Sequence, residues 1–162
     1  MLRRRQLLAA SATLPLFLAL DACAGPDPLA SPPPLSADVR ALFAAAFAEE
    51  NLVSLYKRTT AAYSALAPAL SPLLAEHLAH LAQLRGRIIE PPGKRVPHTV
   101  TSRPPIPATR TAAVAQLRAA EQAAATAQVR RLAGATPSLA QLYASIAASE
   151  STHVSALDRS VR

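Results

Sequence analysis

Apolar residues recur every three or four positions over several long stretches of the chain, which is the spacing of an amphipathic α-helix. The pattern predicts a first helix from Ser36, as its N-cap, to about residue 62. A second helix is expected to end near residue 89, before a proline pair. A third is expected over residues 111–133, with Gly134 as its C′ residue, and a fourth from Pro137 nearly to the C-terminus.

Composition agrees with helices rather than with a sheet. Alanine and leucine dominate the 162 residues, glycines number 4, and apolar residues make up 51%. Such a mixture favours helices that pack through small side chains. The fold class predicted from the sequence is therefore all-α.

The connection between the second and third helices is the least regular part of the pattern. Residues 91–110 hold six prolines and no convincing periodicity, which predicts a long crossover or a lid. The other two connections are short, so each pair of helices should form an antiparallel hairpin. Equal distances from the hairpin turn place the start of the second helix at Leu66 to Pro68, with Pro72 kinking it. A start at Ser71 would instead leave the histidines near one end of the helix.

The two hairpins look like copies of one another. When the segment 73–84 is aligned with the segment 146–157, His80 corresponds to His153. His77 falls where Glu150 stands in the other copy. Because Glu150 and His153 interrupt an apolar stripe, they are expected to face the core, where an unpaired charge is costly and needs a partner.

Glutamates on the first and third helices complete this repeat. The separation along the chain from Glu49 or Glu50 to His77 nearly equals the separation from Glu121 to Glu150. Side chains that face each other across a hairpin must be about equally far from its turn, so the two separations place these residues at matching heights. Neighbours at helical spacing favour Glu49 over Glu50 as the core-facing residue, and both stay candidates.

A glutamate on the first helix, a histidine pair on the second, a long crossover, a glutamate on the third helix and Glu-x-x-His on the fourth resemble the ferritin-like pattern. The chain is most similar to the small exported ferritin-like domain proteins of high-GC Gram-positive bacteria. The resemblance implies a ferritin-like four-helix bundle over residues 36–162, made of two antiparallel hairpins joined by the Pro-rich crossover. It also implies a metal site whose ligands fall on Glu49 or Glu50, His77, His80, Glu121, Glu150 and His153.

One position departs from that family pattern. His77 stands where the family has a bridging carboxylate, and an imidazole does not bridge two ions as a carboxylate does. The sequence therefore predicts at most one divalent ion (Fe, Mn, Zn or Cu). The alternative is a metal-free polar core in which Glu150 pairs with His153 or His77 and Glu121 pairs with His80. Whether the protein is an enzyme is left open.

The N-terminal segment is predicted to be a targeting signal. Arg3, Arg4 and Arg5 precede an apolar run that is too short to span a bilayer. The residues ending at Cys23 resemble a bacterial lipobox, and the arginine pair resembles a twin-arginine signal. These features predict a signal peptide over residues 1–22, lipidation at Cys23 and a Pro-rich tether over residues 23–35. The protein is then expected on the extracytoplasmic face of the cell membrane, held by its lipid.

The formal net charge of the chain limits the classes of partner that it is expected to bind. Removing residues 1–22 takes away three arginines and one aspartate, which lowers the formal charge from +7 to +5. A basic exported surface suits anionic lipids or wall polymers, and with 4% aromatic residues nucleic acid is not expected as a partner. The competing function is a non-enzymatic envelope protein that binds a partner through its basic crossover (Lys94, Arg95, Arg103 and Arg110). A homodimer is compatible with either function.

Overall fold

The computed structural model describes residues 35–89 and 103–160, which contain four long α-helices and no β-strand. The helices and two short 3₁₀ turns follow the order α1 (Ala37–Ala62), η1 (Ser64–Leu66), α2 (Ala67–Arg85), α3 (Arg110–Arg131), η2 (Leu132–Gly134) and α4 (Pro137–Ser160). The all-α prediction is confirmed. The signal peptide, Cys23 and the tether up to residue 34 lie outside the described residues, as do Lys94 and Arg95.

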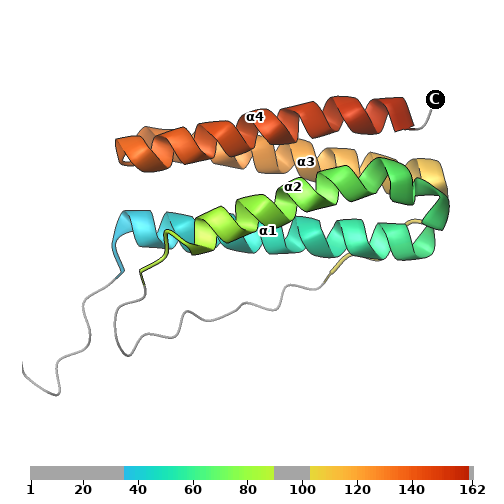
Figure 1. The fold of residues 1–162 in the computed structure, drawn as a ribbon, viewed down its shortest axis with the longest axis horizontal. Coiled ribbons are helices and arrows are strands. Elements are labelled where there is room, and N and C mark those ends of the chain that lie inside the picture. Colours follow the sequence, from blue (N-terminus) through green and yellow to red (C-terminus); the bar gives the residue numbers. More distant parts are fainter. Residues whose placement is uncertain (1–34, 90–102, 161–162) are drawn as a thin grey trace, which may run out of the picture. The chain divides into compact units, whose positions relative to one another are not determined.

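The helices pack as two hairpins. α1 packs against α2, and α3 packs against α4, while α1 also contacts α3 and α2 also contacts α4. Figure 1 shows α2 ending at one end of the bundle and α3 beginning at the other end. The segment that joins them includes residues 90–102, which lie outside the described part of the chain.

Local capping explains most of the helix starts. Ser36 and Thr109 accept hydrogen bonds from the backbone N–H groups of Val39 and Ala112, each at 3.2 Å, so both act as N-caps. α2 begins at Ala67, as the hairpin argument predicted, and Pro72 lies inside it. The carbonyl that loses its helical donor belongs to Pro68, four residues earlier, and both prolines are exposed to solvent.

Two predicted helix ends are wrong. α2 ends at Arg85 rather than near residue 89, and Gly86 is its C-cap. Ile88, which follows the helix, packs against the apolar core. Gly134 is not the C′ residue of α3. The helix tightens into the 3₁₀ turn η2 after Arg131, and Gly134 is the last residue of that turn.

Two apolar clusters fill the bundle and leave a polar layer between them. One cluster is formed by Leu42, Ala45, Ala46, Leu81, Leu84, Leu139, Leu142, Tyr143 and Ile146. The other is formed by Leu55, Tyr56, Leu66, Leu70, Leu73, Val114, Leu117 and Leu157. On α1 the first cluster ends at Ala46 and the second begins at Leu55, so Glu49 is placed between them.

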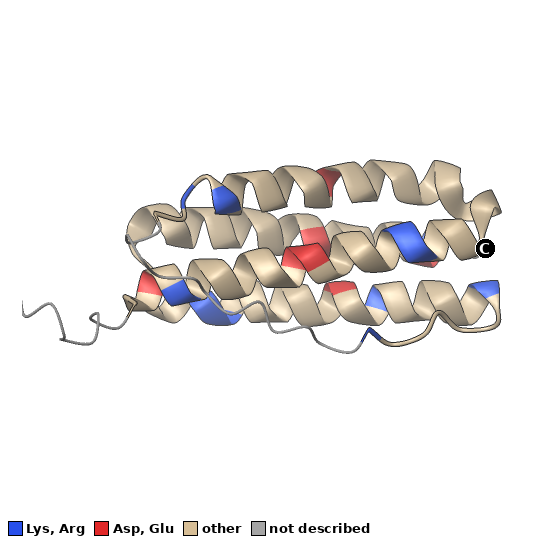
Figure 2. Cartoon of the chain, turned by 90° about the horizontal axis from the view of Figure 1, so that it is seen from below, with Lys and Arg blue, Asp and Glu red and all other residues tan. Residues whose placement is uncertain are grey.

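Acidic and basic residues are distributed differently along the length of the bundle. Figure 2 shows acidic positions on several helices near the middle of the bundle's length, whereas most Lys and Arg positions lie toward its ends. Within the described part of the chain, no helix combines the length and the apolar character needed to cross a membrane.

Candidate metal centre

All four helices contribute to the polar layer. Its members are Glu49 from α1, His77 and His80 from α2, Glu121 from α3, and Glu150 and His153 from α4. All are at most 1% exposed except His80, whose side chain is 11% exposed. Charged side chains are buried this completely only where partners compensate them.

His77 lies between the carboxylates of α1 and α3. Its Nδ1 is 2.9 Å from Glu49 Oε2, and its Nε2 is 2.7 Å from Glu121 Oε1. Burial by itself would lower the pKa of His77, but the hydrogen bonds to Glu121 and Glu49 raise it to about 9. At neutral pH the ring is therefore an imidazolium that donates an N–H hydrogen bond to each carboxylate.

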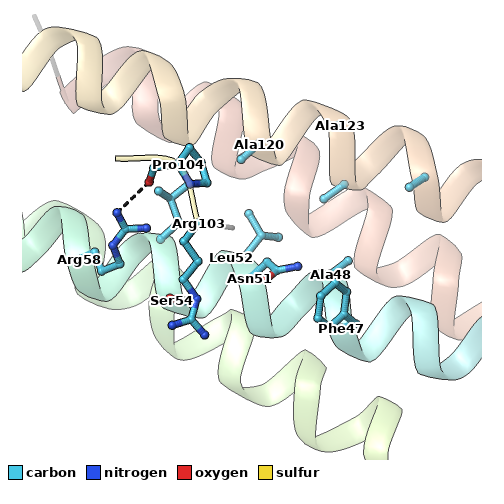
Figure 3. A pocket seen from close by; sticks show the side chains of 13 residues that line it. Phe47, Ala48, Asn51, Leu52, Ser54, Arg58, Arg103, Pro104, Ala120 and Ala123 are labelled. Carbon is cyan, nitrogen blue, oxygen red and sulfur yellow. Dashed lines mark hydrogen bonds between the residues drawn. The ribbon is translucent and has the colours of Figure 1, made fainter. Parts of the chain in front are cut away.

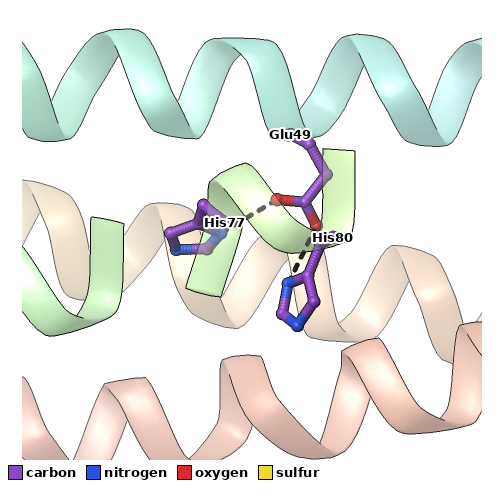
Figure 4. Close-up of side chains that lie close together, drawn as sticks. All are labelled: Glu49, His77 and His80. Carbon is purple, nitrogen blue, oxygen red and sulfur yellow. Dashed lines mark hydrogen bonds and ion pairs between the residues drawn. The ribbon is translucent and has the colours of Figure 1, made fainter. Parts of the chain in front are cut away.

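The other oxygen of Glu49 faces His80. His80 Nδ1 lies 3.6 Å from Glu49 Oε1, so Glu49 is placed between two histidines of α2 (Figure 4). Glu50, the other candidate on α1, is not in the layer. Its carboxylate lies at the surface, 2.6 Å from the guanidinium of Arg85.

His153 connects the layer to the surface. Its Nδ1 is 3.4 Å from Glu121 Oε1, and its Nε2 is 3.0 Å from Oε2 of Glu76, a half-exposed residue of α2. Ser149 donates a hydrogen bond of 2.7 Å to the same Glu76 oxygen. Burial opposes a charge on His153, but the contacts with Glu121 and Glu76 raise its pKa.

Glu150 is the one carboxyl group of the layer that no histidine neutralises. Neither of its oxygens accepts a hydrogen bond from the described residues, and the carboxylate of Glu49 lies beside it. Burial raises the pKa of Glu150 to about 9, and the nearby charges of Glu49 and Glu121 act in the same direction. Glu150 is therefore a neutral carboxylic acid at pH 7.

The remaining carboxylates keep their charge. Burial would raise the pKa of Glu121, but its contacts with His153, His77 and Tyr56 lower it to about 2. Burial would likewise raise the pKa of Glu49, but His77 and His80 lower it. The imidazolium of His77 thus lies between two buried carboxylates and offsets part of their charge.

Several potential ligand atoms of the layer remain without a hydrogen bond in the described part of the protein. They are Glu49 Oε1, His80 Nδ1, Glu121 Oε2, both oxygens of Glu150, and His153 Nδ1. Two groups of residues bring ligand atoms within 4.8 Å of one another, Glu49 with His77 and His80, and His77 with Glu121 and His153. Buried nitrogen and carboxylate donors without partners fit a divalent transition-metal ion.

The pairings expected for a metal-free core are not those of the structure. Glu121 contacts His77 and His153 rather than His80, and His80 instead faces Glu49. Glu150 makes no hydrogen bond with His153 or His77. Spacing along the chain gave the height of each side chain in the bundle but not which of the two histidines of α2 each carboxylate faces.

Sequence reasoning missed three polar residues around the layer, namely Tyr56, Glu76 and Ser149. Tyr56 Oη donates a hydrogen bond of 2.5 Å to Glu121 Oε1. Tyr56 lies two helical turns after Glu49 and so shares its helix face, which was a usable signal. Glu76 and Ser149 occupy equivalent positions in the two hairpins and meet where α2 contacts α4.

No family model, no curated protein and no solved structure matches this chain. The resemblance to ferritin-like proteins therefore stays a prediction from the order and spacing of its motifs. The chemistry of the centre is inferred from the residues that meet there.

Proposed function

We propose that this chain is a ferritin-like bundle that binds one divalent transition-metal ion in its polar layer, with His77, Glu121, Glu150 and His153 as ligands. One observation carries the proposal. Buried carboxylate and imidazole atoms from several helices converge in the layer, and several of them have no hydrogen-bond partner among the described residues. Because an unpaired buried polar atom destabilises a fold, a set of them at one point indicates a ligand.

The outer contacts of the two histidines support this ligand set. His153 contacts Glu76 through Nε2, which leaves Nδ1 directed at Glu121. His77 contacts Glu49 through Nδ1, which leaves Nε2 directed at Glu121 as well. Histidines that bind metals ordinarily donate their second N–H to a carboxylate, and that contact fixes the ring and its tautomer.

The donor types and charges fit one ion. Two imidazole nitrogens with two carboxylates suit Fe, Mn, Zn or Cu. On binding, His77 and Glu150 would each give up a proton, and the carboxylates of Glu121 and Glu150 would then balance a divalent charge. A bound ion of this kind supplies Lewis-acid or redox chemistry toward a small molecule, and Tyr56 and Glu76 would hold the ligands Glu121 and His153 in place.

Metal titration of the purified full chain tests the proposal. Mn²⁺, Fe²⁺, Zn²⁺ or Cu²⁺ should bind with one site per chain, and Glu150→Gln or His153→Gln should remove that site. Glu50→Gln is the matched control, since Glu50 is next to Glu49 in the chain and is bonded to Arg85 at the surface. If binding required His80 but not His153, the ion would lie instead between Glu49, His77 and His80. If none of the four metals bound, the proposal would be refuted.

The competing function is a metal-free envelope protein that acts only by binding a partner. The contacts of His77 with Glu49 and Glu121 favour it, since a hydrogen-bonded network of this kind can be stable without an ion. The metal titration separates the two proposals. For either of them we propose a lipid anchor at Cys23 on the extracytoplasmic face of the membrane, which is supported by the sequence of residues 1–23.

A further inference from the structure

A groove runs along the outside of the bundle between α1 and α3. Its volume is about 500 Å³, within the range of small-molecule binding sites. Figure 3 shows the groove between the two helices, with Phe47 toward one end and Arg58, Arg103 and Pro104 toward the other. None of the residues that line it belongs to the polar layer. We call it the α1/α3 groove.

Side-chain size explains why the groove is open. Where leucines would close the gap, α3 presents the methyl side chains of Ala120, Ala123, Ala124 and Ala127. α1 forms the other wall with the apolar side chains of Phe47, Leu52 and Leu55. Among the described residues, a long apolar surface is therefore left open between two helices whose inner faces are packed.

The charge of the groove is confined to one end and has one sign. Arg58 and Arg103 are the charged residues that line it, and no acidic side chain is among the lining residues. Arg58 donates a hydrogen bond of 2.7 Å to the carbonyl of Pro104, which holds this guanidinium beside the segment that enters α3. No ion pair of Arg103 is found within the described part of the chain.

We propose that the α1/α3 groove binds a long-chain fatty acid, with the acyl chain along the alanines of α3 and the carboxylate at Arg103. The stretch of α1 from Phe47 to Arg58 corresponds to about 16 Å of helix, so the groove suits an extended chain rather than a compact ligand. Apolar walls with cationic groups at one end complement an anionic amphiphile.

The lining also argues against a peptide ligand. Asn51 and Ser54 are the uncharged polar side chains that line the groove. A peptide backbone would leave most of its N–H and C=O groups without partners there, and that loss opposes binding. A saturated acyl chain has no such groups.

Displacement of a fluorescent fatty acid from the full chain in detergent-free buffer tests the proposal. Hexadecanoate should bind with one site per chain, and its affinity should fall about tenfold for every two methylene groups removed from the chain. Hexadecanol, which lacks the charge, should bind about threefold more weakly, and Arg103→Gln should weaken hexadecanoate by a similar factor. Ala123→Leu should weaken it at least tenfold, because the leucine occupies the groove.

Matched variants distinguish the groove from general adsorption. Ala119→Leu places the same side chain at an exposed position of α3 outside the groove, and Arg130→Gln removes one charge elsewhere on that helix. Both should bind hexadecanoate like the parent. Ala123 is exposed, so Ala123→Leu should keep the parent melting temperature, and Arg103→Gln provides a second test on a surface residue.

Three results would overturn the proposal. The first is the absence of saturable binding by the full chain, which would mean that the groove is closed or filled by another part of the protein. The second is equal binding by Ala123→Leu and Ala119→Leu. The third is a dimer that Ala123→Leu dissociates, because the groove would then hold a second copy of the chain.

Discussion

Replacing Glu150 by glutamine should make the metal-free protein more stable at neutral pH while it removes the metal site. Glu150 is fully buried, and burial raises its pKa from the ordinary value of 4.5 to about 9. The folded protein therefore holds a proton on Glu150 that the unfolded chain releases above pH 4.5. Glutamine has nearly the same shape and needs no proton to be neutral.

The size of the effect follows from the two pKa values. Between pH 4.5 and 9 the folded state binds one more proton than the unfolded state at this site, so stability falls by about 1.4 kcal/mol per pH unit. At pH 7, two and a half units above the unfolded pKa, Glu150 destabilises the fold by roughly 3 kcal/mol. Glu150→Gln should recover that amount, which corresponds to about 10 °C in Tm for a helical domain of this size.

Urea denaturation in the presence of a chelator, at pH 4.5 and at pH 7, measures the difference. The variant should exceed the parent by roughly 3 kcal/mol at pH 7 and match it at pH 4.5. With metal at a thousandfold excess over its Kd the order should reverse, because the ion stabilises only the parent, by about 4.1 kcal/mol. A variant that is less stable than the parent in chelator at pH 7, or a difference that does not change with pH, would refute the reasoning.

Three further predictions concern metal affinity, the apolar core and the anchor. Since His77 and Glu150 each have a pKa of about 9, binding an ion should displace at least two protons, and a metal titration should show Kd falling about a hundredfold per pH unit between pH 6 and 8. A Kd that does not change with pH would contradict this. Leu117 is fully buried between helices, and Leu117→Ala should cost about 2–5 kcal/mol in urea denaturation; a loss below about 1 kcal/mol would contradict the packing. Cys23→Ser should release the protein from membranes, and unchanged fractionation, with no lipid on the native protein by mass spectrometry, would refute lipidation.

Helical periodicity predicted the four helices because each buries one stripe of side chains. The start of α2 near Ala67 followed from the symmetry of the two hairpins, even though Pro72 by itself argued for a later start. The same periodicity favoured Glu49 over Glu50, and the structure places Glu49 in the core and Glu50 at the surface. These inferences succeeded because they depend on local spacing.

The partner of each polar side chain in the core could not be predicted in this way. The spacing of Glu121 and Glu150 gives their height in the bundle but not which histidine each one faces. His77 of α2 reaches Glu121 of α3 across the centre of the bundle, and α2 lying beside α4 brings Glu76 to His153. The end of α2 was missed for a local reason, because apolar residues after Gly86 continue the helical pattern although the chain has already left the helix.

The location of the ion tests the central claim most directly. Crystals of the full chain grown with Zn²⁺ at pH 8, with anomalous data collected at the zinc edge, would show each bound ion and its ligands. We predict one peak in the polar layer, coordinated by His77 Nε2, His153 Nδ1, Glu121 and Glu150. No peak in the layer, or two peaks about 3.5–4 Å apart as in two-metal centres, would contradict the account.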